Sequence, residues 1–245
     1  MTTTPTSTSA SPPAAVDFDG TTLVADIVLA HPECARVFKE HKIDFCCQGK
    51  QPLTEACERR SLEVGAVIGQ LSAAIAARAG QAQERDPRTM SIPGLVALII
   101  ERHHNWLREG LPWIQAMANK VGRVHGGHDP RLVELDTVVT GLKDALLPHL
   151  DEEENVLFPA LMARATPPAV ITEGLAAMES EHLQVGGLLE RARTLTDDFA
   201  PPEWACGTYR TLLAELDHLE DDVLRHVHME NHVLARKARE AAKIA

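Results

Sequence analysis

One short pattern occurs twice in the second half of this chain. Residues 149–157 and residues 226–234 both read His-x-x-x-Glu-x-x-Val-Leu, and their starts are 77 positions apart. A histidine and a glutamate four positions apart lie on the same face of a helix, one turn from each other. An isolated histidine precedes each copy, His104 by 45 positions and His182 by 44 positions. The repeat therefore predicts two similar helix pairs that bring imidazoles and carboxylates together.

Apolar residues recur at helical spacing through this half of the chain, and turn residues interrupt them. They predict four long helices, over about 92–124, 130–164, 166–196 and 202–245. Asp129 and Pro130 supply an N-cap and a first-turn proline for the second helix. Short connections predict an all-α fold with an up-down four-helix bundle. Prolines at positions 112, 148 and 159 fall inside the pattern, where kinks are expected.

The helix lengths place the histidines at one level of such a bundle. At about 1.5 Å per residue, His104 lies roughly 30 Å before the first turn and His149 roughly 29 Å after it, so an antiparallel pair brings them together. The second pair matches less closely, because the fourth helix is longer. Apolar residues at helical spacing flank His182 and direct that face to the core. They are Leu175, Met178, Val185 and Leu189.

These side chains form a candidate metal site. A single His-x-x-x-Glu on a helix is usually a solvated ion pair. Two copies, level with two more histidines, would bury four imidazoles and two carboxylates, which is costly without a cation. Six donors exceed the four of a closed zinc site, and mixed imidazole and carboxylate donors suit iron or manganese. The predicted ligands are His104, His149, Glu153, His182, His226 and Glu230.

Two iron ions would satisfy this ligand set. If both glutamates bridge, each ion receives two histidines and two carboxylate oxygens. An oxo or hydroxo bridge adds a fifth donor, so about one position per ion stays open to a small molecule. A ferritin-like di-iron site needs two Glu-x-x-His motifs. Glu101 with His104 makes one such motif, but the motif that is repeated in register is His-x-x-x-Glu, so that alternative is rejected.

The first third of the chain is organised differently. Residues 1–20 are rich in Thr, Ser, Pro and Ala, which predicts a disordered tail. Short helical stretches predict a small helical domain over 21–79. The polar segment 80–90 carries glycine and proline and is predicted to be a linker. The bundle then occupies 91–245.

Composition limits the compartment and the partners. Of the 245 residues, 24 are Lys or Arg and 35 are Asp or Glu, a net charge of -11 that argues against nucleic-acid binding. The N-terminus lacks the basic start and apolar core of a secretory signal, and no apolar run reaches the roughly 18–20 residues of a membrane span. The cysteine count is 5, an odd number that predicts reduced thiols and a cytoplasmic location.

The chain also resembles known families. Its second half resembles the hemerythrin-like domain in Arg102-His103-His104, residues 120–125, His149 to Glu153, Leu157-Phe158-Pro159, Glu181-His182 and residues 226–231. Its first half carries Asp44-Phe45-Cys46-Cys47 with Gly49-Lys50, the mark of a small N-terminal domain. Together, about residues 20–240 are similar to the RIC family of di-iron proteins, which repair iron-sulfur clusters. Leu107, Gln48 and Pro148 depart from the common pattern but remove no predicted ligand.

The resemblance implies the same six ligands, with both glutamates bridging, and a role in restoring clusters damaged by nitric oxide or oxidants. Donation of iron is the leading hypothesis. Reduction of nitric oxide to nitrous oxide, an enzymatic activity, and hemerythrin-like binding or sensing of O2 or nitric oxide are the alternatives. The expected partners are damaged iron-sulfur proteins, nitric oxide or O2, an unidentified electron donor and a second copy of the chain.

The adjacent Cys46 and Cys47 are candidate catalytic thiols. A disulfide between neighbouring cysteines needs a strained ring, so both are expected to be reduced. One interpretation is structural; in the other, a thiolate carries electrons or iron to or from the metal centre, or reacts with nitric oxide. Lys50 and the helix start near Leu53 would favour the thiolate. The other cysteines are expected to be structural, His125 to be a surface or capping residue, and His228 and His232 to be solvated.

Overall fold

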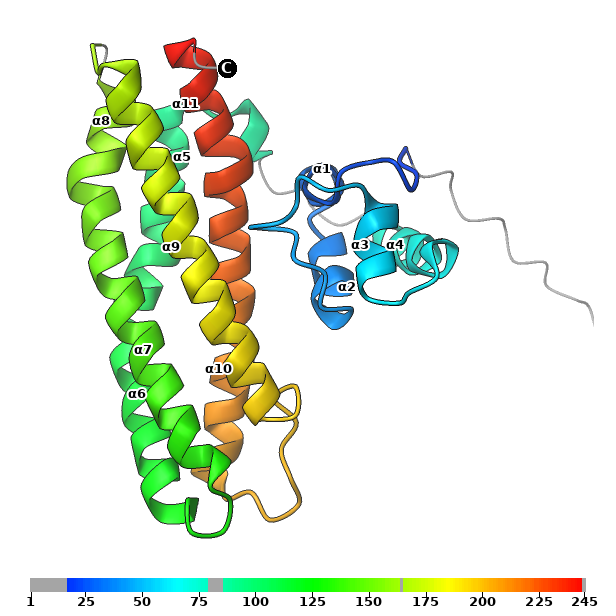
Figure 1. The fold of residues 1–245 in the computed structure, drawn as a ribbon, viewed down its shortest axis with the longest axis vertical. Coiled ribbons are helices and arrows are strands. Elements are labelled where there is room, and N and C mark those ends of the chain that lie inside the picture. The colour runs from blue at the N-terminus through cyan, green and yellow to red at the C-terminus, as the bar shows by residue number, and fades with distance from the viewer. Residues whose placement is uncertain (1–16, 79–85, 164, 244–245) are drawn as a thin grey trace, which may run out of the picture. The chain divides into compact units, whose positions relative to one another are not determined.

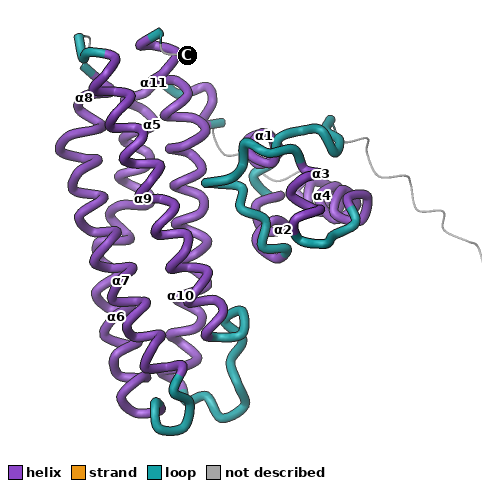
Figure 2. The backbone as a smooth tube through the Cα atoms, viewed as in Figure 1, coloured by secondary structure: helices purple, strands orange, loops and turns teal. Residues whose placement is uncertain are grey.

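The computed structural model describes residues 17–78, 86–163 and 165–243. Across these ranges the regular structure is helical, and the one β-bridge joins Leu23 to Pro52 (Figure 2). The all-α class expected from the sequence is confirmed. The chain divides into two compact units, residues 1–84 and 85–245. Most of the predicted tail, residues 1–16, and much of the predicted linker, residues 80–85, lie outside the described residues.

The described part of the first unit, residues 17–78, forms four helices. They are α1 (Val24–Ala30), α2 (Cys34–Glu40), α3 (Leu53–Arg59) and α4 (Val64–Arg78). α2 packs on α1, and both α2 and α3 pack on α4. Fully buried Phe38, Leu53 and Leu71 fill the space between these helices.

A loop over residues 44–50, which we call the thiol loop, lies between α2 and α3. The backbone N–H of Ala25 donates to the carbonyl of Gly49 at 2.9 Å and ties the loop to the start of α1. A Cβ at position 49 would lie 2.3 Å from the carbonyl oxygen of Phe45, so only glycine fits this close approach. The Phe45 side chain is buried, which anchors the loop in the core of the unit.

The second unit is a bundle of four long helical rods (Figure 1). After the single turn η1 (Pro87–Thr89), the first rod is α5 (Ile92–Ile99), η2 (Ile100–His104) and α6 (Asn105–His125). The second is α7 (Arg131–Glu152), η3 (Glu153–Leu157) and α8 (Phe158–Met162), and the third is α9 (Pro168–Leu195). The fourth is α10 (Gly207–Met229), η4 (Glu230–Leu234) and α11 (Ala235–Ala242).

The rods run up and down and close into a ring. α6 packs against α7 and α10, and α9 packs against α7 and α10. Local caps set where the rods begin. The Ser91 hydroxyl accepts the N–H of Gly94 at the start of α5, and the Asp129 carboxylate accepts the N–H of Arg131 at the start of α7. Both satisfy backbone donors that the first helical turn leaves unpaired.

Three of the rods contain a π-helical turn, namely η2, η3 and η4. The sequence predicted irregularity at the prolines instead. Pro112 and Pro148 lie inside the continuous helices α6 and α7, and only Pro159 adjoins a π turn, at the start of α8. A π turn inside an α-helix is rare and occurs frequently at functional sites. The residues within these π turns are therefore candidates for a functional site.

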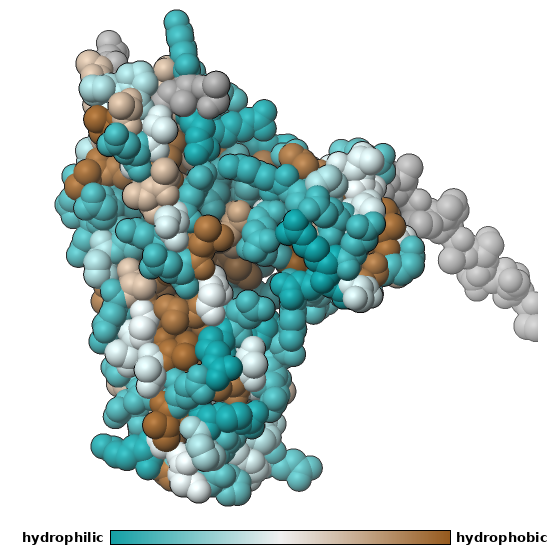
Figure 3. Space-filling view, in the orientation of Figure 1, coloured by the Kyte–Doolittle hydropathy of each residue, from teal (hydrophilic) through white to brown (hydrophobic). Residues whose placement is uncertain are grey.

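Apolar side chains at the surface form separate patches among hydrophilic residues on the face shown in Figure 3. Within residues 17–78, 86–163 and 165–243, none of the helices has both the length and the apolar character that a membrane span requires.

Candidate metal centre

All four rods of the bundle contribute to one buried cluster of histidines and glutamates. His182 comes from the middle of α9, while the other five residues lie within or next to the π turns. Every member is almost fully buried. The structure brings together all six residues singled out in the sequence, which are His104, His149, Glu153, His182, His226 and Glu230.

The π turns define where the cluster lies along the rods. His104 is the last residue of η2, Glu153 is the first of η3, and Glu230 is the first of η4. His149 and His226 lie one turn earlier, in the last turns of α7 and α10. Each His-x-x-x-Glu pair therefore spans the junction between an α-helix and a π turn.

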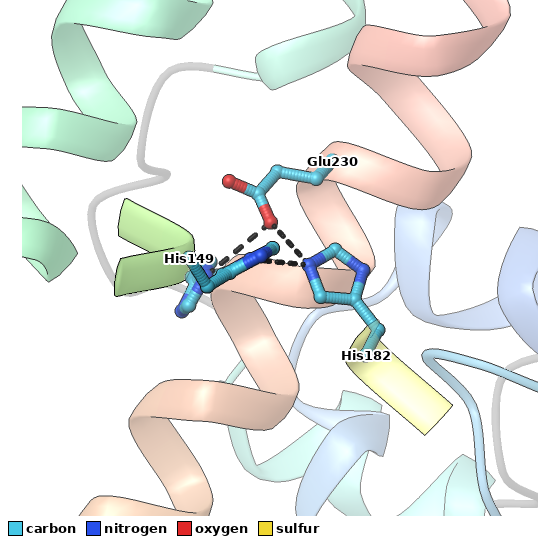
Figure 4. A group of neighbouring side chains, drawn as sticks. His149, His182 and Glu230 are labelled. Carbon is cyan, nitrogen blue, oxygen red and sulfur yellow. Dashed lines mark hydrogen bonds and ion pairs between the residues drawn. The ribbon is translucent and has the colours of Figure 1, made fainter. Parts of the chain in front are cut away.

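One half of the cluster surrounds His149 and His182 (Figure 4). Their Nε2 atoms lie 3.1 Å apart. Nε2 of His149 is 3.3 Å from Oε1 of Glu153, and Nε2 of His182 is 3.2 Å from Oε2 of Glu230. In Figure 4 the side chains of His149, His182 and Glu230 converge on one point.

The other half surrounds His104 and His226. Nε2 of His104 is 3.4 Å from Oε2 of Glu153 and 3.6 Å from Oε1 of Glu230. Nε2 of His226 is 3.3 Å from Oε2 of Glu230. Each glutamate thus lies between the two histidine pairs, and Glu153 directs one oxygen to each of them.

The donor atoms fit a bound cation. Both carboxylate oxygens of Glu153 and Glu230, and Nε2 of His104 and His226, are buried without a hydrogen bond. Burying polar atoms in this way is costly unless something compensates them. Four imidazole nitrogens and four carboxylate oxygens facing one another are the donors that iron and manganese accept.

The electrostatics of the cluster point the same way. Burial and the neighbouring Glu230 raise the pKa of Glu153 well above its usual range. Burial also opposes ionisation of Glu230, but His226 and the other imidazoles hold its pKa well below the usual range. Burial lowers the pKa of His149 and of His226, which favours the neutral imidazole that binds metals.

Three histidines of the cluster are oriented by oxygen atoms whose role the sequence did not reveal. Nδ1 of His104 donates to Glu154 at 2.9 Å, and Nδ1 of His149 donates to Glu181 at 2.6 Å. Nδ1 of His182 lies 3.0 Å from the Oδ1 of Asn231, which accepts its hydrogen. Such partners fix the ring and would leave Nε2 with its lone pair free for a metal ion. A signal was present, because Glu154 and Asn231 each follow the glutamate of one repeat.

The remaining histidines of this half do not join the cluster. Nδ1 of His103 lies 2.7 Å from Asp222. Nε2 of His125 lies 3.2 Å from the sulfur of Cys206, at the far end of α6 from His104. His228 and His232 are buried, with exposed fractions of 4% and 8%, so the expectation that they are solvated was wrong. The helical periodicity of the sequence alone does not predict which faces of the fourth rod are buried.

A pocket of about 70 Å³ adjoins the cluster between α7, η3 and α9. His149 and Glu153 line it together with Gly174 and Met178, and Glu181 also borders it. The side chain of Glu181 is 45% exposed. The pocket therefore offers small molecules a path toward the ligands of the cluster.

The candidate thiols Cys46 and Cys47 lie in the first unit and form no disulfide. Their sulfur atoms are 3.5 Å apart. The hydrogen bond with Cys47, burial and the nearby Asp44 carboxylate raise the pKa of Cys46 well above its usual range. The expected stabilisation of a thiolate near Lys50 therefore does not hold for Cys46.

Both units match known families. Residues 96–238 match the model described as Hemerythrin HHE cation binding domain, and residues 21–75 match the one described as Domain of Unknown function (DUF542). Similar curated proteins include the Iron-sulfur cluster repair protein YtfE of Yersinia pseudotuberculosis serotype IB (strain PB1/+) and that of Yersinia pestis (strain Pestoides F). Each is 33% identical over 216 residues, which cover 86% of this chain and 94% of the relative.

Proposed function

Since the chain belongs to the family of hemerythrin-like iron-sulfur cluster repair proteins, we propose that it repairs iron-sulfur clusters damaged by nitric oxide or oxidative stress by donating iron. The observation that carries this proposal is the position of Glu153 and Glu230 between two pairs of histidines. Their four buried oxygens make no hydrogen bond and are suited to holding two cations side by side.

In this proposal the six clustered residues bind two iron ions per chain, with both glutamates bridging and an oxo or hydroxo bridge between the ions. Bound iron supplies the material for rebuilding a cluster. Burial favours the neutral imidazole of His149 and His226. Glu154, Glu181 and Asn231 orient the rings of His104, His149 and His182, respectively, so these rings need no rearrangement to bind.

The donor set also suits release. Ferrous iron stands low in the affinity order of divalent metals, and thiolates favour iron-sulfur assembly. The cluster in the bundle offers only nitrogen and oxygen donors, so thiolate-rich acceptors compete well for the iron. The partly exposed Glu181 at the pocket beside His149 gives the departing cation a carboxylate close to the surface.

The proposed role implies several partners for the protein. Damaged iron-sulfur proteins receive the iron, nitric oxide or O2 is the small ligand, and an electron donor keeps the iron ferrous. Cys46 and Cys47 assist transfer. A homodimer and a cytoplasmic location are part of the proposal. Reduction of nitric oxide to nitrous oxide is not favoured, because the relatives named above are described as repair proteins.

A reconstitution assay tests the proposal. An iron-sulfur dehydratase is inactivated with nitric oxide and then incubated anaerobically with the iron-loaded protein or with an equal amount of free ferrous iron. The protein should restore activity faster than free iron. The His149→Ala/His226→Ala variant should not, whereas a control with two exposed histidines replaced, His128→Ala/His218→Ala, should retain the effect. Recovery no faster than with free iron would overturn the proposal.

A further inference from the structure

The thiol loop of the first unit carries one carboxyl group and two thiols within four consecutive positions, at Asp44, Cys46 and Cys47. The sulfur atoms of Cys46 and Cys47 are 3.5 Å apart, and the sulfur of Cys46 is 3.2 Å from Oδ1 of Asp44. One ligand atom from each residue lies within 4.8 Å of the others. Cys46 is buried, while Asp44 and Cys47 are partly exposed, so the group can be reached from outside.

The loop is held in this shape before anything binds. Oδ1 of Asp44 accepts the backbone N–H of Cys46 at 3.0 Å and that of Cys47 at 2.8 Å. Buried Phe45 and the Ala25–Gly49 hydrogen bond anchor the two ends of the loop. A carboxylate has about four acceptor sites, so these two bonds do not exhaust Asp44. Preorganised donors bind without an ordering cost.

Ionisation of the two thiols is unfavourable without a cation. Two thiolates and a carboxylate with ligand atoms within 4.8 Å of one another would repel. A bound metal ion reverses the situation, because a coordinating thiol is deprotonated outright. The side chains that resist ionisation in the metal-free loop therefore become strong ligands around a divalent cation.

We propose that Asp44, Cys46 and Cys47 form a mononuclear site for a divalent transition-metal cation, with two thiolates and one carboxylate as ligands. Metal–sulfur bonds of about 2.3 Å in a tetrahedral arrangement place two sulfurs about 3.8 Å apart, close to the 3.5 Å of the loop. The two thiols lose two protons as the two metal–sulfur bonds form, and the oxidation state of the metal does not change.

Three protein ligands leave a fourth tetrahedral position open. Closed four-ligand sites hold structural metals, whereas sites with an open position exchange ligands. The thiol loop is therefore suited to carrying iron transiently, and this carrier role rests on the proposed function. The metal site itself does not depend on it, because the ligands and their spacing belong to the first unit alone.

Cobalt(II) is the probe that tests the site. The full chain, reduced and loaded with ferrous iron, is titrated anaerobically with Co²⁺ while the thiolate-to-cobalt charge-transfer absorption and proton release are recorded. One equivalent of Co²⁺ should produce the band and release two protons. Cys46→Ser and Cys47→Ser should each abolish two-thiolate coordination. Cys206→Ser, which removes an exposed cysteine of the bundle, should change nothing.

Asp44→Asn separates ligation from folding. The amide oxygen can still accept the two N–H groups of the loop, so the fold should persist, as circular dichroism would show. Loss of the charged ligand should weaken Co²⁺ binding at least about tenfold, since even indirect partners of metal ligands contribute 10–100-fold. No thiolate band in the reduced wild type, or a band that persists in the Cys46→Ser/Cys47→Ser double variant, would overturn the site.

The same proteins distinguish the two proposals. If Co²⁺ binds as expected but Asp44→Asn repairs clusters as fast as the wild type, the carrier role is wrong and the site stands. If Co²⁺ binds as expected but the wild type repairs no faster than free iron, the proposed function is wrong and the site again stands.

Discussion

Glu154 accepts a hydrogen bond from Nδ1 of His104 at 2.9 Å, although the two residues lie 50 positions apart on different rods of the bundle. Asn231 and His182 form the matching pair, 49 positions apart. In both halves, the residue after the glutamate of the repeat orients the histidine of the preceding rod. The repeat in the sequence thus extends from the proposed ligands to the residues that support them.

Glu154→Ala should weaken iron binding by about 10–100-fold, because an unsupported imidazole loses both its orientation and its basicity. Arg108 also donates to Glu154 at 3.0 Å and would lose that partner. Competition with a ferrous chelator measures the affinity. Glu190→Ala, which removes an exposed carboxylate on the neighbouring rod α9, is the matched control. Equal affinity in the two variants would show that Glu154 does not support His104.

Glu153→Leu should stabilise the metal-free protein and abolish the stabilisation by iron. The carboxylate oxygens of Glu153 are buried without a hydrogen bond, and relieving such a group is worth about 1–3 kcal/mol. With iron bound, the wild type gains stability by mass action, and the variant cannot. Urea unfolding without and with iron measures the free energy of unfolding of the variant and of the wild type. The variant should be the more stable protein without iron, and the wild type should be the more stable one with iron.

The same pair of proteins should differ in pH dependence. The folded metal-free state holds the pKa of Glu153 above that of the unfolded chain, so it binds the proton more tightly. Its contribution to stability is fully present at low pH and is lost as the pH rises toward the raised pKa. The advantage of Glu153→Leu should therefore be small near pH 4 and grow toward neutral pH. An advantage that is constant with pH would contradict the assigned shift.

The six residues of the buried cluster could be predicted from the sequence because the constraint on them is local. A histidine and a glutamate one turn apart share a face in any helix, and two copies can be recognised without the fold. The π turns at Glu153 and Glu230 could not be predicted, since the change in hydrogen bonding depends on packing against the other rods. The role of Glu181 likewise depends on which rod lies beside His149. The sequence shows that Cys46 and Cys47 are adjacent. The position of Asp44 beside their sulfur atoms could not be predicted, because it depends on the conformation of the loop.

The cysteines should differ widely in reactivity with iodoacetamide. Burial, with a contribution from Glu33, raises the pKa of Cys34 to about 12, and the residue has no exposed surface. Near pH 8 its thiolate fraction should be at least about a thousandfold below that of an ordinary cysteine. Peptide mass spectrometry over time should find the exposed Cys206 labelled early and Cys34 only after unfolding in urea. Rapid labelling of Cys34 in the native protein would contradict the burial of this thiol.

Gly174→Leu should slow the access of nitric oxide to the metal centre without removing iron. Gly174 lines the pocket beside His149 and Glu153, and a Cβ at this position would lie 2.8 Å from Cδ1 of Leu157. A leucine must fill the pocket or displace Leu157. Admitting nitric oxide then requires one of these side chains to leave its preferred rotamer, which costs on the order of 1 kcal/mol and corresponds to a rate about fivefold lower.

Gly187→Leu is the matched control, because a Cβ at Gly187 meets nothing within 4 Å and both substitutions replace glycine in α9 with a good helix former. Stopped-flow absorption of the ferrous protein mixed with nitric oxide gives the rate, and metal analysis gives the iron content. Both variants should retain iron, and only Gly174→Leu should react slowly. Equal rates would mean that nitric oxide reaches the histidines by another path, and the pocket between η3 and α9 would then have no part in access.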